Sequence, residues 1–106
     1  MQTKPHMPIT TPTRGEETTI TQIQAVIVEL EGTLTGGVPI ISYQIDYDKG
    51  TNSAEWEILK GFNSNDLTLF AIKTGLTINE PYKFRYRAKN IYDWGDYSEE
   101  ALLVPT

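Results

Sequence analysis

The chain has 106 residues, a formal net charge of -5 and no cysteine. Its length is typical of one domain with one core. The lack of cysteine excludes disulfides, thiolate nucleophiles and Cys-based zinc sites, and the acidic balance disfavours nucleic acid as a partner. No stretch has the apolar character of a signal peptide or a membrane span, so we expect no insertion into a membrane.

The first residues are polar and include Pro5 and Pro8. Proline favours an extended backbone, so residues 1–8 are predicted to form a flexible linker that leads into a folded domain at residues 9–106. At the other end, Pro105 cannot donate to a strand ladder and should end the last strand. We therefore expect one link of a longer chain.

Turn residues recur at short spacing, and no segment keeps a helical period for long, which is typical of antiparallel strands. The predicted strands cover, in chain order, residues 10–14, 22–30, 40–47, 55–59, 67–73, 82–89 and 97–104. Turns or loops are predicted between them at residues 32–39, 48–53, 61–66 and 90–96. The predicted fold class is all-β, an antiparallel sandwich of seven strands.

Residues 82–89 alternate strictly between apolar and basic side chains. Successive side chains of a strand point to opposite faces, so one row is predicted in the core and the other in water. The apolar row is Tyr82, Phe84, Tyr86 and Ala88, and the basic row is Lys83, Arg85, Arg87 and Lys89.

The strand at residues 22–30 has apolar side chains on both faces. We favour Ile23, Ala25 and Ile27 as its inward set, which leaves Val26 and Val28 on an outer face. The two valines are either ordinary exposed residues or a contact for a neighbouring module.

Residues 36–47 read GGVPIISYQIDY, residues 56–59 read WEIL, and Leu76 stands six residues before Tyr82. From Pro8 to Pro105 these motifs resemble the fibronectin type III family, with its glycine loop and strand C, its strand C′ and its E-to-F crossing. The resemblance implies an immunoglobulin-like sandwich and a tyrosine corner, in which the Tyr82 hydroxyl bonds to upstream backbone.

The chain departs from the family pattern at two positions. Ile27 or Leu30 replaces the Trp usual late in strand B, and Ile78 replaces the Pro usual two residues after the Leu. Other large side chains must fill the space of the missing Trp. The predicted structural core is Ile27, Tyr43, Ile45, Trp56, Phe70, Ile72, Leu76, Tyr82, Phe84 and Tyr86.

No catalytic residue, metal site or cofactor is predicted. The only histidine, His6, has no acid or nucleophile nearby in sequence. The spacing Asp46-x-Asp48 resembles half a calcium loop, but Gly50 stands at the fifth position, where such a loop needs an oxygen ligand. We therefore favour an ordinary turn and expect no enzyme.

The basic row has two interpretations. It is either a docking strip for an acidic ligand or a sheet face neutralised by adjacent strands. In the family topology its neighbours would be Gln44 and Asp46 on strand C, with Glu55 and Glu57 on strand C′ next along. Opposite charges across strands attract weakly but locally, so we favour the neutralised face.

The loop at residues 90–96, which corresponds to the F–G loop of the family, carries aromatic side chains where a loop should be polar. Aromatic residues dominate interface hot spots. The candidate partner-binding residues are Tyr92, Asp93, Trp94 and Asp96. In the alternative, Trp94 folds back over the end of the sandwich and Tyr97 begins the last strand. Trp94 also replaces the Arg of the Arg-Gly-Asp motif that some family members carry, so integrin binding is not supported.

The resemblance implies a non-catalytic module of a larger multidomain surface or scaffold protein, serving as spacer and protein-interaction unit, for example in cell adhesion. Its expected partners are a protein or neighbouring modules of the same chain. The expected location is extracellular or at the cell surface, with an intracellular scaffold left open. The alternative function is an accessory, non-catalytic domain attached to an extracellular enzyme.

Overall fold

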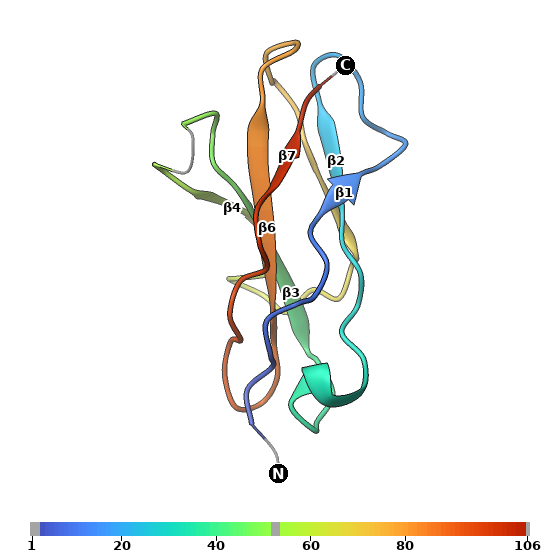
Figure 1. The fold of residues 1–106 in the computed structure, drawn as a ribbon, viewed down its shortest axis with the longest axis vertical. Coiled ribbons are helices and arrows are strands. Elements are labelled where there is room, and N and C mark those ends of the chain that lie inside the picture. The colour runs from blue at the N-terminus through green and yellow to red at the C-terminus, as the bar shows by residue number, and fades with distance from the viewer. Residues whose placement is uncertain (1–2, 52–53, 106) are drawn as a thin grey trace.

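Two antiparallel sheets pack face to face in the computed structural model, which describes residues 3–51 and 54–105 (Figure 1). Over these residues one sheet has the strand order β1 (Thr13–Arg14), β2 (Ile23–Val26), β5 (Phe70–Lys73). The other has the order β4 (Glu57–Lys60), β3 (Ser42–Tyr47), β6 (Tyr82–Lys89), β7 (Ala101–Leu103). A short 3-10 helix, η1 (Gly32–Thr35), lies between β2 and β3. The prediction of an all-β, seven-stranded immunoglobulin-like sandwich is confirmed.

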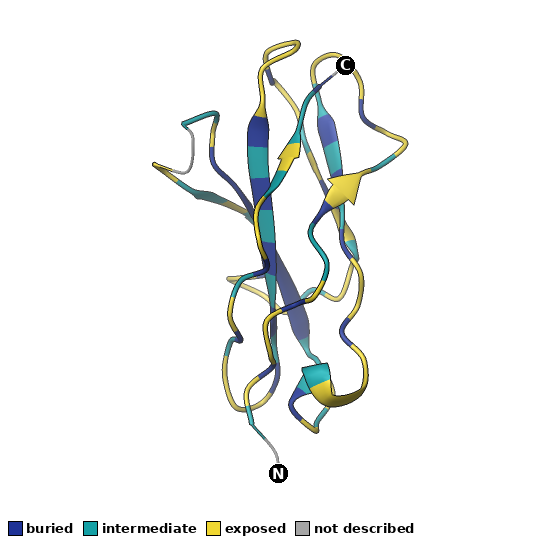
Figure 2. Ribbon diagram, in the orientation of Figure 1, coloured by how far each residue is buried: buried dark blue, intermediate teal, exposed yellow. Residues whose placement is uncertain are grey.

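The core lies between the sheets and is built from alternating residues of the long strands. Along β6, buried and half-buried residues alternate from end to end (Figure 2). Along β2 and the residues that follow it, Ile23, Ala25 and Ile27 are buried and at most 2% exposed, whereas Val28 is 54% exposed. The inward set predicted for this strand is therefore correct. The other buried apolar side chains are Leu30, Tyr43, Ile45, Tyr47, Ala71, Leu76, Tyr82, Phe84, Tyr86 and Ala88.

Buried tyrosine hydroxyls bond to the backbone at both ends of the core. The backbone N–H of Thr77 donates to the Tyr82 hydroxyl at 3.1 Å, which is the expected tyrosine corner. The N–H of Leu30 donates to the Tyr43 hydroxyl at 2.9 Å. Because an unpaired buried hydroxyl is costly, these bonds allow tyrosine to serve as a core residue.

Phe70 and Ile72 were predicted in the core, and this prediction is wrong. Each is 43% exposed, whereas Ala71 between them is 8% exposed. The register explains the difference, because Ala71 lies opposite the inward-facing Ala25 of β2, while Phe70 lies opposite Val26 on the outer face. The small side chain of β5 therefore points inward.

Trp56 is also outside the core, contrary to prediction. It is half-buried and precedes β4. Its ring lies against the guanidinium of Arg85, whose half-buried place in β6 puts it on the outer face of the four-stranded sheet. A tryptophan can cover an arginine there because the ring face attracts a cation.

The entry segment, residues 3–8, is held against the sandwich and is not the flexible linker expected. The N–H of Thr3 donates to the Gly36 carbonyl at 2.8 Å, and the N–H of His6 donates to the Leu34 carbonyl at 3.0 Å. Pro5 is buried. Residues 1–2 of the predicted linker, residues 52–53 of the predicted turn and residue 106 of the predicted domain lie outside the described residues.

Candidate functional site

The basic row was predicted to lie in water. It is instead half-buried on the outer face of the four-stranded sheet. The guanidinium carbon of Arg85 lies 4.0 Å from the centre of the Trp56 ring and 3.8 Å from that of Tyr97. That of Arg87 lies 4.6 Å from the Tyr97 ring centre and 4.7 Å from that of Trp94. Aromatic faces attract cations, so the rings cover the two arginines.

The alternation of rings and cations continues to the end of β6. The ammonium of Lys89 lies 5.5 Å from the centre of the Trp94 ring. Phe62, from the turn after β4, stacks on Trp94. The two ring centres are 6.1 Å apart, and the angle between the ring planes is 16°. The aromatic–cation stack thus comprises Trp56, Arg85, Tyr97, Arg87, Trp94 and Lys89, in that order.

Strand β3 supplies a polar partner for each of the two arginines, and Asp46 neutralises Arg85 as expected. Asp46 lies opposite Arg85 and Gln44 opposite Arg87 in the strand register. The Arg85 Nε is 3.4 Å from Asp46 Oδ2, and the Arg87 Nε donates to Gln44 Oε1 at 3.0 Å. The Asp46 side chain is only 2% exposed. These contacts favour a paired sheet face over a docking strip for an acidic ligand.

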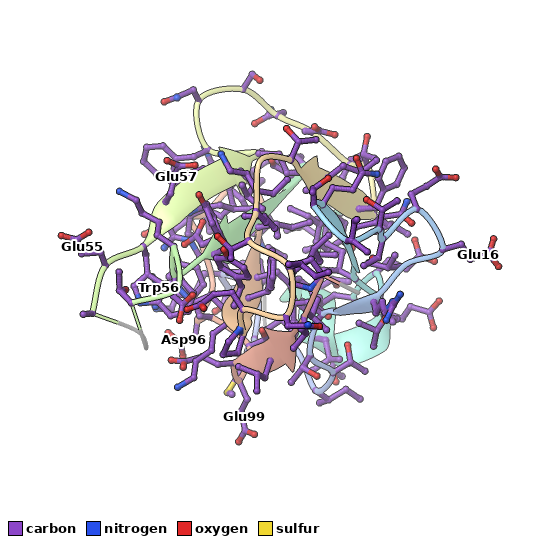
Figure 3. The ribbon with its side chains drawn as sticks, turned by 90° about the horizontal axis from the view of Figure 1, so that it is seen from above. Glu16, Glu55, Trp56, Glu57, Asp96 and Glu99 are labelled. Atoms are coloured by element: carbon purple, nitrogen blue, oxygen red, sulfur yellow. The ribbon has the colours of Figure 1, made fainter. Side chains whose placement is uncertain are left out.

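The acidic residues near β4 take other partners than the sequence suggested. Glu57 pairs with Lys73 of β5 at 3.3 Å, and Glu55 lies 3.9 Å from Lys49. Figure 3 shows Glu55 extending outward from the molecule. The prediction that these two carboxylates neutralise the basic row is therefore wrong. From this part of the chain it is the Trp56 ring that contacts the basic row.

Tyr97 joins the stack to the polar pairs of β3. Its hydroxyl accepts a hydrogen bond from the Gln44 amide at 2.9 Å. Burial, with Asp46 nearby, raises the pKa of this hydroxyl above its ordinary value. Tyr97 precedes β7, so the expectation that it begins the last strand is wrong.

The four candidate residues of the F–G loop differ in their exposure to solvent. Tyr92 is 50% exposed, and Asp93 and Asp96 are exposed. Trp94 is half-buried and forms an isolated bridge with Lys89. Trp94 therefore folds back onto the outer face of the sheet and not over the end of the sandwich. Among the candidates it supports the loop, while the other three face solvent.

Asn90 shapes this loop, and sequence reasoning missed it. It is fully buried, and its side-chain oxygen accepts the N–H of Tyr92 at 2.9 Å. Its amide nitrogen donates to the carbonyls of Thr3 at 2.7 Å and Thr35 at 2.9 Å. Asn commonly caps a turn in this way, so an Asn directly after a strand was the available signal.

Among the described residues, no group of three or more histidine or acidic side chains gathers as a metal site would require. Asp48, which resembled a calcium ligand, is buried and accepts the N–H groups of Gly50 and Lys83 at 3.0 Å each. This is the turn role expected for it. No helical segment in the described part of the chain is long and apolar enough to cross a bilayer.

No family model matches the sequence, and no curated protein matches it. Solved structures are similar over nearly the whole chain. The fourth FNIII domain of a human protein has a TM-score of 0.80 at 18% identity, over 98% of this chain and 81% of that one. The domain of human fibronectin type III domain containing protein 3 has a TM-score of 0.73 at 20% identity, over 98% and 88%. A crystal structure of titin domains has a TM-score of 0.67 at 15% identity, over 98% of this chain and 32% of that one.

Proposed function

The chain has the fibronectin type III fold, and on this premise we propose that it is a non-catalytic module of a larger multidomain protein, acting as spacer and protein-interaction unit. The elongated shape supports the spacer role. The molecule measures 46 Å along its longest axis, and the chain enters at one end of that axis and leaves at the other (Figure 1).

The observation that carries the interaction role is an exposed aromatic side chain on a fixed loop. Tyr92 is half-exposed, while its own N–H is bound by the buried Asn90. A binding residue on a preordered backbone loses little conformational entropy when a partner binds. Tyrosine also buries much area with few rotatable bonds.

The proposed contact surface consists of Tyr92, Asp93 and Asp96, with Trp94 as their support. Phe62, which is 45% exposed and stacked on Trp94, extends it with a second aromatic ring. Aromatic side chains are enriched in protein–protein interfaces, whereas charged side chains belong to the polar rim, so we place the two rings at the centre of the contact and the carboxylates at its edge. We propose an extracellular or cell-surface location for the parent protein.

Affinity capture with the immobilised full chain tests this function. Three forms are compared, namely the unaltered chain, Tyr92→Ala, and Ile72→Ala as a control that changes an exposed side chain on the opposite sheet. We expect a protein captured by the unaltered chain and the control to be lost with Tyr92→Ala. Equal capture by all three forms would refute a contact role for the loop.

A further inference from the structure

We propose that Asn90 is a positioning residue that couples the entry segment to the F–G loop. In this proposal, docking of residues 3–6 on the sandwich holds the loop in its ordered conformation. The coupling follows from the geometry alone, and its consequence for binding rests on the proposed function.

The buried side chain of Asn90 bonds to the entry segment through its amide nitrogen and to the F–G loop through its oxygen. The Asn90 amide nitrogen donates to the Thr3 carbonyl at 2.7 Å, and its oxygen accepts the N–H of Tyr92 at 2.9 Å and of Asp93 at 3.4 Å. The side-chain amide is planar, so its donor and acceptor groups move together. The same nitrogen also donates to the Thr35 carbonyl at 2.9 Å. Release of Thr3 therefore leaves the amide with one of its two anchors and weakens its hold on the loop.

A second contact joins the same two segments independently of Asn90. A methyl group added at Gly95 would lie 2.3 Å from the Pro5 carbonyl oxygen, so Pro5 packs directly on the loop backbone. The N–H of Gly95 in turn donates to the Ala88 carbonyl at 2.8 Å. The entry segment thus touches the loop near its start and near its end.

The other anchors of the entry segment belong to a different connection. The N–H of Thr3 and the N–H of His6 bond to the carbonyls of Gly36 and Leu34, which belong to the connection between β2 and β3. In Figure 1 the start of the chain runs between that connection and the F–G loop. The segment can therefore be released by changes that remove no atom of the loop.

The test uses the full chain with Thr3→Pro and His6→Pro together, which removes both N–H donors. Amide hydrogen exchange is measured by NMR at Tyr92 and Asp93, with Ala25 in the centre of β2 as internal reference. We expect exchange at the two loop amides to rise by about fivefold to tenfold while the reference is unchanged, since local openings set such rates. The matched control is Lys4→Ala, which alters an exposed side chain of the same segment and should leave loop exchange unchanged. Unchanged loop exchange in the double variant would overturn the proposal.

Substitutions of Asn90 separate the two ends of its side chain. Asn90→Asp keeps an acceptor for the loop amides but loses the donors to Thr3 and Thr35. Exchange at His6 should therefore rise, while Tyr92 stays more protected than in Asn90→Ala. Equal exchange at Tyr92 in both variants would contradict the assigned roles. If exchange shows the coupling but no partner is captured, only the proposed function fails.

Discussion

The guanidinium carbon of Arg85 lies 4.0 Å from the centre of the Trp56 ring, so the tryptophan expected in the core covers a cation outside it. The same guanidinium pairs with Asp46, whose side chain is 2% exposed. Arg85 therefore connects a buried carboxylate of β3 to the aromatic layer above the sheet. The basic row is a packed part of the structure.

Replacing Arg85 should be costly because its partner is buried. We expect Arg85→Met to lower the free energy of unfolding by about 2 to 4 kcal/mol, since Asp46 would keep its charge without the cation. Arg85→Lys should cost less, about 1 kcal/mol, because it keeps the charge but loses the planar stacking. Urea denaturation measures both values. A Met variant as stable as the unaltered chain would show that the pair contributes nothing.

Trp94 should contribute to stability through its stacking contacts. Trp94→Ala removes the contact with Phe62 and the faces that cover Arg87 and Lys89. We expect a loss of about 1 to 3 kcal/mol in the free energy of unfolding. Trp94→Phe, which retains an aromatic face, should recover part of it. An unchanged denaturation midpoint for Trp94→Ala would mean that the ring is free at the surface.

The tyrosine corner gives a prediction about a single oxygen atom. Tyr82→Phe leaves the N–H of Thr77 without its acceptor. The expected loss is about 1 to 2 kcal/mol in the free energy of unfolding, with the fold retained. Tyr92→Phe is the control, because Tyr92 is half-exposed and water at the surface can replace a bond lost with its hydroxyl. The idea fails if both variants are equally stable.

Stability should fall in alkaline solution because buried tyrosines resist ionisation. Burial raises the pKa of Tyr43 and of Tyr86 above the ordinary tyrosine value. A raised pKa in the folded state contributes stability that is complete below the unfolded value of about 10 and is lost as the pH rises through the folded value. We expect the free energy of unfolding to decrease as the pH rises above about 10, and less steeply in Tyr86→Phe. Parallel pH profiles for the two proteins would rule out a contribution from Tyr86.

The sequence predicted the features that a repeating pattern or a local motif determines. The alternation of apolar and basic residues correctly predicted β6 and its inward face, since every apolar side chain from Tyr82 to Ala88 is buried. The resemblance to the fibronectin type III family around Leu76 and Tyr82 identified the corner. The orientation of β5 could not be predicted in this way, since Phe70, Ala71 and Ile72 are all apolar and only the pairing with β2 decides which of them faces inward.

The remaining errors concern contacts between segments far apart in the chain. Nothing near Trp56 in sequence indicates that it will cover Arg85, and nothing near Pro5 indicates that the entry segment will pack on Gly95. Asn90 bonds to Thr3, which is 87 positions away in the chain, and to Thr35, which is 55 positions away. Its contacts with three separate segments are therefore visible only in the folded structure.

Equilibrium binding of a captured partner to Tyr92→Ala, measured beside its urea denaturation, tests the proposed contact surface most directly. We predict affinity at least tenfold weaker than that of the unaltered chain, as expected for loss of an aromatic hot spot, with stability changed by no more than about 0.5 kcal/mol. The control Ile72→Ala should bind as the unaltered chain does. Unchanged affinity in Tyr92→Ala, or an equal loss in Ile72→Ala, would contradict the assignment of the F–G loop as the interaction surface.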